Sequence, residues 1–182
     1  GNSIASGGNY NVAVGDEAGT ALTTGDSNVA IGFEALLTED AHGWNVAVGY
    51  HALRLLDAGA NAENTAVGWH SGAVMTEGVK NVLVGSQSGD ALTHADFNVA
   101  VGYGALGADT LGSKSTALGH TALSVQNFTT ATDTYNTAVG YNAGGAVTTG
   151  IHNTIVGGLA GDSLTDADYN TVVGQGALSV DT

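Results

Sequence analysis

The chain has 182 residues, with 17 Asp and Glu against 3 Lys and Arg, and so carries a formal net charge of −14 at pH 7. Three cations cannot neutralise a row of phosphates, so this balance excludes a nucleic-acid-binding protein and argues against contact with an anionic membrane surface. Without cysteine there is no disulfide framework or thiolate metal site, and no apolar run approaches the ~18 residues of a membrane-spanning helix.

In chain order, we expect residues 1–10 to be a partial coil or lead-in, and a tandem repeat then fills residues 11–182 as one domain. Each copy opens on Asn-Val-Ala-Val-Gly or a close variant; we number its first residue position 1 and its glycine position 5. Most copies start 17 residues apart. Position 1 is Asn11, Asn28, Asn45, Asn64, Asn81, Asn98, Ser115, Asn136, Asn153 and Asn170. Position 5 is Gly15, Gly32, Gly49, Gly68, Gly85, Gly102, Gly119, Gly140, Gly157 and Gly174.

This repeat predicts an all-β fold. The period is too short for a helical pair or a propeller blade. Positions 2 to 4 are β-branched or small residues between Asn and Gly, which is typical of a short strand that ends in a turn. One unit buries too little apolar surface to offset the ordering of its backbone, so the units must stack on one another. We expect a parallel β-solenoid of about ten coils, ~48 Å long at ~4.8 Å per coil.

Positions 9 and 12 indicate one core slot in each coil, because native packing allows it to be neither empty nor filled twice. Where position 9 is Gly, position 12 is a large apolar residue: Leu22, Met75, Leu92, Val147 and Leu164. Elsewhere position 9 is Leu: Leu36, Leu53, Leu106, Leu123 and Leu178. In those coils position 12 is Glu39, Asp109, Gln126 or Asp181, and Leu56 is the exception.

Two columns and the strand faces have structural interpretations. We expect the Asn column to form hydrogen-bonded ladders and the Gly column to need positive φ or a tight corner. Position 3 faces away from positions 2 and 4, yet it is never polar, so both faces of the strand are apolar. We expect the second face to meet another chain, with the small Ala at position 3 permitting close approach, and so predict a homo-oligomeric rod.

Ten of the eleven aromatic residues fall in two columns. Position 6 holds Phe33, Tyr50, Trp69, Tyr103 and Tyr141. The residue just before position 1 is Tyr10, Trp44, Phe97, Tyr135 or Tyr169 in five coils. Stacking along the rod or packing at a seam between chains explains both columns. Contact with a glycan or receptor is the alternative; for it we favour the position-6 residues, above all the consecutive Phe33, Tyr50 and Trp69.

Titratable residues predict no catalytic, cofactor or metal site. His51 and His70 share position 7 in adjacent coils and could form a metal pair, but solvated surface histidines are the simpler interpretation. The acidic stretch from Asp162 to Asp168 could attract Ca²⁺. Since no Asp recurs at one position of every coil, solubilisation is the better interpretation. Insertions at Arg54–Glu63 and Ser124–Tyr135 are either recognition loops or tolerated longer turns.

The tandem motif Asn-x-Ala-(Val/Ile)-Gly-x-x-(Ala/Ser) covers residues 11–178, as in Asn28–Gly32 with Ala35 and Asn136–Gly140 with Ala143. It resembles the YadA-like head repeats of trimeric autotransporter adhesins and the related repeats of phage tail fibres, marine phages included. The resemblance implies a left-handed parallel β-roll, a homotrimer, and a role in adhesion or host recognition at a cell or virion surface. The 17-residue period is longer than that of the adhesin heads, and we expect the chain to be a segment of a longer protein.

We therefore expect a non-enzymatic fibre or adhesin segment that forms a rigid extracellular rod. A self-assembling filament is one alternative, because the end coils of a solenoid can stack on one another. Ice binding is another, because β-solenoids can present a flat column of Thr. Such a column lies five residues before several repeats: Thr23, Thr76, Thr93, Thr110, Thr148 and Thr165.

Overall fold

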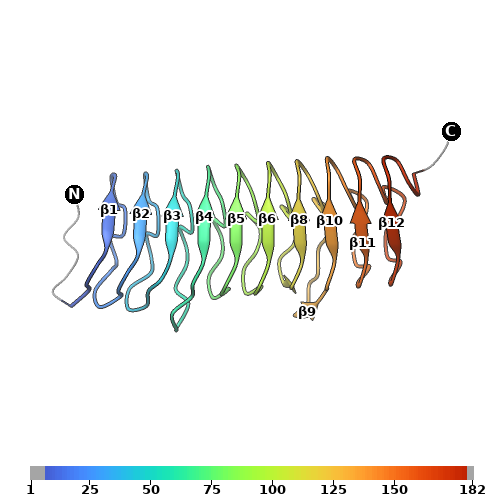
Figure 1. The fold of residues 1–182 in the computed structure, drawn as a ribbon. Helices are drawn as coiled ribbons and strands as arrows, with labels where there is room; N and C mark the ends of the chain where they lie inside the picture. The colour runs from blue at the N-terminus through green and yellow to red at the C-terminus, as the bar shows by residue number, and fades with distance from the viewer. Residues whose placement is uncertain (1–6, 180–182) are drawn as a thin grey trace.

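The computed structural model describes residues 7–179, and the chain winds through them as an elongated rod with its two ends at opposite tips (Figure 1). Most of the predicted lead-in, residues 1–6, lies outside the described residues, as does Asp181. Strands and turns make up the described part, and it contains no helix, so none that could cross a membrane.

Each coil contributes one three-residue strand to a single ten-stranded sheet. These strands are β1 (Val12–Val14), β2 (Val29–Ile31), β3 (Val46–Val48), β4 (Thr65–Val67), β5 (Val82–Val84), β6 (Val99–Val101), β8 (Thr116–Leu118), β10 (Thr137–Val139), β11 (Thr154–Val156) and β12 (Thr171–Val173). Every neighbouring pair is parallel and joins equal repeat positions, as in Val12 opposite Val29. The prediction of a parallel β-solenoid of about ten coils is confirmed.

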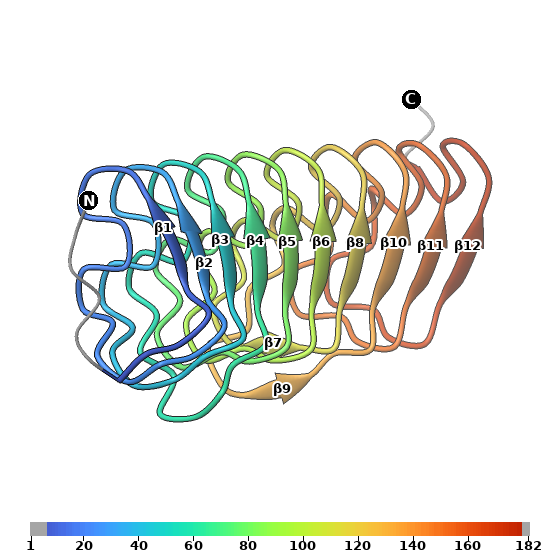
Figure 2. The ribbon, with the colours of Figure 1, turned by 60° about the vertical axis from the view of Figure 1, so that its left-hand side comes forward.

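The second insertion contributes one strand of a short extra pair, and the preceding coil contributes the other. Strands β7 (Gly112–Ser113) and β9 (Thr132–Asp133) are parallel and form a sheet of their own. Both coils with insertions extend beyond the outline that the other coils share (Figure 2). The insertions therefore lengthen turns without shifting the register of the ten-stranded sheet.

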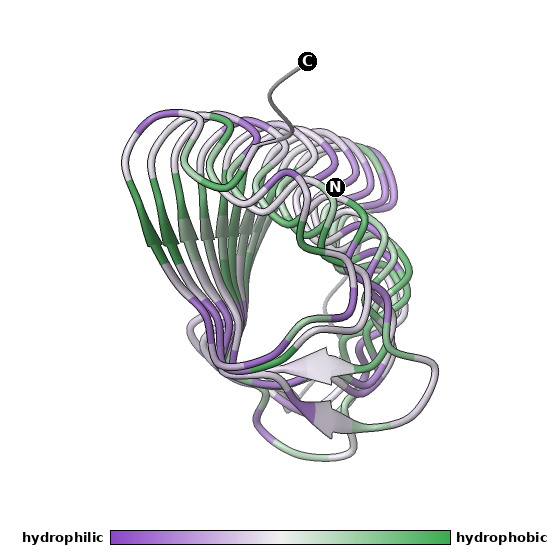
Figure 3. Cartoon of the chain, turned by 90° about the vertical axis from the view of Figure 1, so that its right-hand side faces the viewer, coloured by the Kyte–Doolittle hydropathy of each residue, from purple (hydrophilic) through white to green (hydrophobic). Residues whose placement is uncertain are grey.

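The strands turn position 3 inward and positions 2 and 4 outward. Ala30, Ala47 and Ala66 at position 3 are fully buried. Outward side chains such as Val67 and Val82 stay 36–38% exposed. Our assignment of position 3 to contact between chains is wrong: its Ala residues line the interior of their own coil. The second apolar face exists, but positions 2 and 4 form it, and it makes one apolar wall of the rod (Figure 3).

The Asn column runs through the interior as a hydrogen-bonded ladder. Asn28 Oδ1 accepts a hydrogen bond from the backbone N–H of Asn45 at 3.0 Å, and its Nδ2 donates to the carbonyl of His42 at 3.0 Å. The next coils repeat this pattern, and the inner Asn side chains are buried. Each Asn thus satisfies buried backbone groups of the following coil, which would otherwise lack partners.

The one coil without this Asn is repaired by the second insertion. Ser115 Oγ lies 2.5 Å from Thr134 Oγ1 and accepts a hydrogen bond from Gln126 Nε2 at 2.9 Å. Thr134 Oγ1 in turn accepts from the backbone N–H of Asn136 at 3.4 Å, the donor that an Asn side chain satisfies in other coils. A residue of the insertion therefore stands in for the missing rung, because Ser is too short to reach it.

The core slot is filled from either of two backbone positions, as the sequence predicts. The position-9 Leu residues of the inner coils are fully buried, and so are Met75 and Leu92 at position 12. Position 9 has positive φ in both kinds of coil, for example 52° at Leu36 and 57° at Gly19. A Cβ on Gly19 would lie 2.9 Å from Leu22 Cδ1. The two residues therefore compete for one volume.

Position 12 is buried even where it is polar, which the sequence did not predict. Glu39, Asp109 and Gln126 are fully buried. Asp109 Oδ1 accepts hydrogen bonds from the backbone N–H groups of Gly112 and Phe128, both at 3.0 Å. Burial raises the pKa of the Glu39 carboxyl, and hydrogen bonds from backbone N–H groups oppose that shift. In the coils of Leu36, Leu106 and Leu123, the turn beside the core slot is thus held by a buried polar group, whereas the third coil buries both Leu53 and Leu56.

A substitution pair tests this competition. Gly19→Leu should lower the free energy of unfolding by about 1–3 kcal/mol through overpacking, and Leu22→Ala by about 2–5 kcal/mol through a cavity. The double variant should recover much of both losses, since Leu at position 9 then fills the volume that Leu22 vacates. Chemical denaturation followed by circular dichroism measures all three. Simple addition of the two losses would contradict a shared slot.

Candidate functional site

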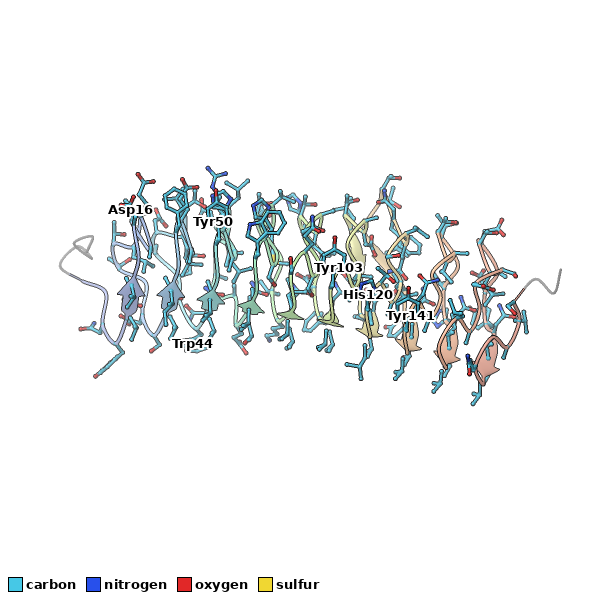
Figure 4. All side chains as sticks on the ribbon, turned by 90° about the horizontal axis from the view of Figure 1, so that it is seen from above. Asp16, Trp44, Tyr50, Tyr103, His120 and Tyr141 are labelled. Atoms are coloured by element: carbon cyan, nitrogen blue, oxygen red, sulfur yellow. The ribbon has the colours of Figure 1, made fainter. Side chains whose placement is uncertain are left out.

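The position-6 aromatic column follows the glycine corner of each coil. After position 5 the chain leaves the sheet, so the side chain at position 6 lies at its edge. Tyr50, Tyr103, His120 and Tyr141 mark this line along the rod, whereas Trp44, from the column before position 1, lies on the other side of the strands (Figure 4). The two aromatic columns therefore flank the apolar sheet face along its two edges.

The aromatic side chains stack along the rod in short runs. The Phe33 and Tyr50 ring centroids are 5.3 Å apart at an interplanar angle of 17°. Tyr50 stacks on His51, and Trp69 on His70, each at 3.9 Å. Position 6 of the next coil is Ser86, and no stack in the described residues crosses it. Phe33, Tyr50 and Trp69 thus form one band with two histidines.

Two further stacks each place a histidine between two tyrosines. In the position-6 column, His120 lies between Tyr103 and Tyr141, with centroids 5.2 and 5.3 Å apart. In the other column, His152 lies between Tyr135 and Tyr169, at 5.1 and 4.7 Å. The stacking of these two histidines was not predicted, although counting repeat positions finds it: they occupy the same positions as the aromatic residues above and below them.

The stacking direction decides which part of each ring faces solvent. Neighbouring coils lie one above the other along the rod, so near-parallel rings present their faces to each other and their edges outward. The five position-6 aromatic side chains are still 37–60% exposed. This geometry supports the stacking interpretation of the column. Contact of Phe33, Tyr50, Trp69, Tyr103 or Tyr141 with a glycan or receptor stays a prediction.

His51 and His70 meet beneath this band. His51 Nδ1 lies 3.2 Å from His70 Nε2, and His51 Nε2 lies 3.1 Å from Glu34 Oε2, which also pairs with Arg54 Nε. The His51 side chain is only 17% exposed, so its description as a solvated surface residue is wrong. Burial is the main cause that lowers the pKa of His51; the Glu34 carboxylate opposes the shift, and Arg54 and His70 add to it.

The Thr column is a second ladder between coils. Thr23 Oγ1 donates to the carbonyl of Asp40 at 3.0 Å, and Thr93 Oγ1 to the carbonyl of Thr110 at 3.0 Å. Thr76, Thr110 and Thr148 donate to the next coil in the same way. Because these hydroxyls already donate to backbone carbonyls, they are less free to order the water molecules that an ice-binding surface must hold.

Several Asp carboxylates in the turns also accept hydrogen bonds from backbone N–H groups. Asp96 Oδ1 accepts a hydrogen bond from the backbone N–H of Val79, and Asp168 Oδ1 from that of Ile151, both at 2.8 Å. Asp26 Oδ1 accepts from the backbone N–H of Asn9 at 2.6 Å. These Asp residues share one repeat position and join adjacent coils, a structural use that their scatter in sequence concealed.

The outward sheet face is a surface feature that runs through all ten coils of the rod. Its twenty positions, 2 and 4 of the ten coils, are Val, Thr, Ile or Leu throughout, and none carries a charge. When one face of a sheet is exposed to water, the residues on that face are normally polar. Within residues 7–179 the structure shows no pocket. The candidate functional site is therefore this face with its flanking aromatic columns.

Comparison with models of known protein families, with curated proteins and with solved structures finds no match to this chain.

Proposed function

We propose that this chain is a non-enzymatic structural segment of a fibre or surface adhesin, in which it serves as a rigid rod. The observation that carries the proposal is the uncharged, mainly apolar face of ten in-register strands, in which fifteen of the twenty outward residues are Val, Ile or Leu and five are Thr. A structure that repeats one short coil becomes longer with each added repeat. The Asn and Thr hydrogen-bond ladders join each coil to the next and so resist bending of the rod. Such a rod suits an extracellular location on a virion tail or cell surface, where a long, rigid segment can extend away from the particle or cell.

The face supports assembly with further copies of the same chain. Contiguous exposed apolar surface of this kind marks an interaction site in soluble proteins. A partner must match a pattern that repeats every coil, and another copy does so coil by coil. The strands are only three residues wide, so each chain offers a narrow strip, which suits packing around a common axis. We therefore propose a homotrimer with left-handed coils, whose strips meet at the centre.

The decisive test places charge on this face. Val82 and Val84 are outward residues of β5; Val74, on another side of the coil, is equally exposed, at 39% against 38% for Val82. Val82→Asp with Val84→Asp should dissociate the trimer, because it buries like charges together, whereas Val74→Asp should leave it intact. Light scattering measures the mass of each. A wild-type chain with the mass of a monomer would contradict the proposal.

Filament formation through stacking of the end coils is the alternative. Rods that stack end to end would appear as fibres of indefinite length in electron microscopy, and discrete short rods are expected from the trimer. Ice binding finds less support, since the hydroxyls of the Thr column donate to carbonyls of the next coil.

A further inference from the structure

Two neighbouring coils interrupt the Thr column, and the interruption gathers metal-binding side chains. Counted from the start of each coil, the Thr residues of this column occupy position 13, where the second coil has Asp40 and the third has Asp57. One ligand atom from each of Glu39, Asp40, His42 and Asp57 lies within 4.8 Å of all the others. Because opposite ligands of one divalent cation are about 4–5 Å apart, these four atoms can surround a single ion.

The Glu39 carboxylate is held in place before any ion binds. It is fully buried, and its Oε1 accepts a hydrogen bond from the backbone N–H of His42 at 3.1 Å. Its Oε2 accepts one from the backbone N–H of Ala58 at 3.4 Å. Each oxygen keeps a second lone pair. Both of these partners are neutral backbone groups, so only the neighbouring His42 imidazole or a bound cation can balance the charge of this buried carboxylate.

The imidazole of His42, whose side chain is 28% exposed, adds a nitrogen to the three carboxylates. Its Nδ1 is shielded from solvent and makes no hydrogen bond within the described residues, although it lies 3.4 Å from Glu39 Oε1. A shielded polar atom without a hydrogen bond is uncommon in folded proteins. A cation beside Glu39 would use the lone pair of this nitrogen, since neutral imidazole is the commonest metal ligand.

We propose that Glu39, Asp40, His42 and Asp57 bind a divalent first-row transition-metal cation such as Zn²⁺ between the second and third coils. One imidazole with three carboxylates favours such an ion over Ca²⁺, which takes oxygen ligands. Asp40 and Asp57 are exposed, and their carboxylates make no hydrogen bond in the described part of the chain, so they can turn toward the ion. Asp57 belongs to the first insertion, which the ion would tie to the preceding coil.

The test is a calorimetric titration of the full chain with Zn²⁺ alone at pH 7. Asp57→Asn is compared with Asp166→Asn, a matched change of an exposed turn carboxylate outside the cluster. We expect the wild-type chain and Asp166→Asn to bind Zn²⁺ equally well, and Asp57→Asn to bind at least tenfold more weakly. His42→Asn should weaken Zn²⁺ binding at least as much. Circular dichroism without metal should show all three variants folded, since each change is at an exposed or half-buried side chain.

Three outcomes would overturn the proposal. One is a wild-type chain that binds no Zn²⁺. The second is equal Zn²⁺ affinity in wild type, Asp57→Asn and His42→Asn, which would place binding elsewhere, for example at His51 and His70. The third is Ca²⁺ bound as tightly as Zn²⁺ and unaffected by His42→Asn, which would remove the imidazole from the site. None of these outcomes bears on the proposed trimer, whose face lies on other residues.

Discussion

Replacing Gly102 with alanine is expected to destabilise the rod by about 3–6 kcal/mol, enough to unfold its central coils. Gly102 has a φ of +134°, which L side chains rarely adopt, and a Cβ there would lie 2.4 Å from the carbonyl oxygen of Gly119 in the next coil. The carbonyl oxygen belongs to the backbone, and the backbone also fixes the position of the Cβ, so neither atom can rotate away. Thermal denaturation followed by circular dichroism measures the loss.

The matched control is Gly104→Ala, two residues further along the same coil. Gly104 also has positive φ, +58°, but the nearest atom to its Cβ would be Thr121 Cγ2 at 3.7 Å. Only the backbone penalty applies there, so we expect a loss of about 1–2 kcal/mol. Equal losses in the two variants would show that φ alone, and not the close approach of successive coils, explains the invariant glycine.

Replacing Asn81 with alanine is expected to cost about 2–6 kcal/mol, because it leaves two buried backbone groups without partners. Asn81 Oδ1 accepts a hydrogen bond from the N–H of Asn98 at 2.9 Å, and Asn81 Nδ2 donates to the carbonyl of Ala95 at 2.8 Å. The gap left by the side chain is small and closed to solvent. Chemical denaturation measures the change in the free energy of unfolding.

Asn170→Ala in the last described coil is the control for the ladder. Asn170 Nδ2 donates to Asn153 Oδ1 and to the carbonyl of Asp168, both at 3.0 Å, but its Oδ1 accepts no hydrogen bond within residues 7–179. We expect a loss clearly smaller than that of Asn81→Ala. A loss as large as at Asn81 would contradict the view that the ladder acts by satisfying the next coil.

The candidate site could be predicted only in part. Repeat positions place Phe33, Tyr50 and Trp69 on one line, since equal positions stack in any solenoid with this register. They also bring His51 and His70 together. The same count could have found His120 and His152 in their stacks, because each shares a position with its aromatic neighbours. The buried state of Glu39 could not be found in this way, because a polar residue in a turn is ordinarily solvated.

The sequence by itself determined the period, the parallel register and the need for stacking. A pattern repeated ten times at nearly constant spacing allows only one register in which equal repeat positions of neighbouring coils pair. Only the tertiary structure decided which strand face points inward. In a three-residue strand with apolar residues on both faces, the sequence pattern does not show which face is buried. The path of the turns decides this, because the turns close the coil on one side of the strand. That choice buries the Ala residues of position 3, leaves an apolar wall outside, and folds the turns so that Glu39, His42 and Asp57 meet.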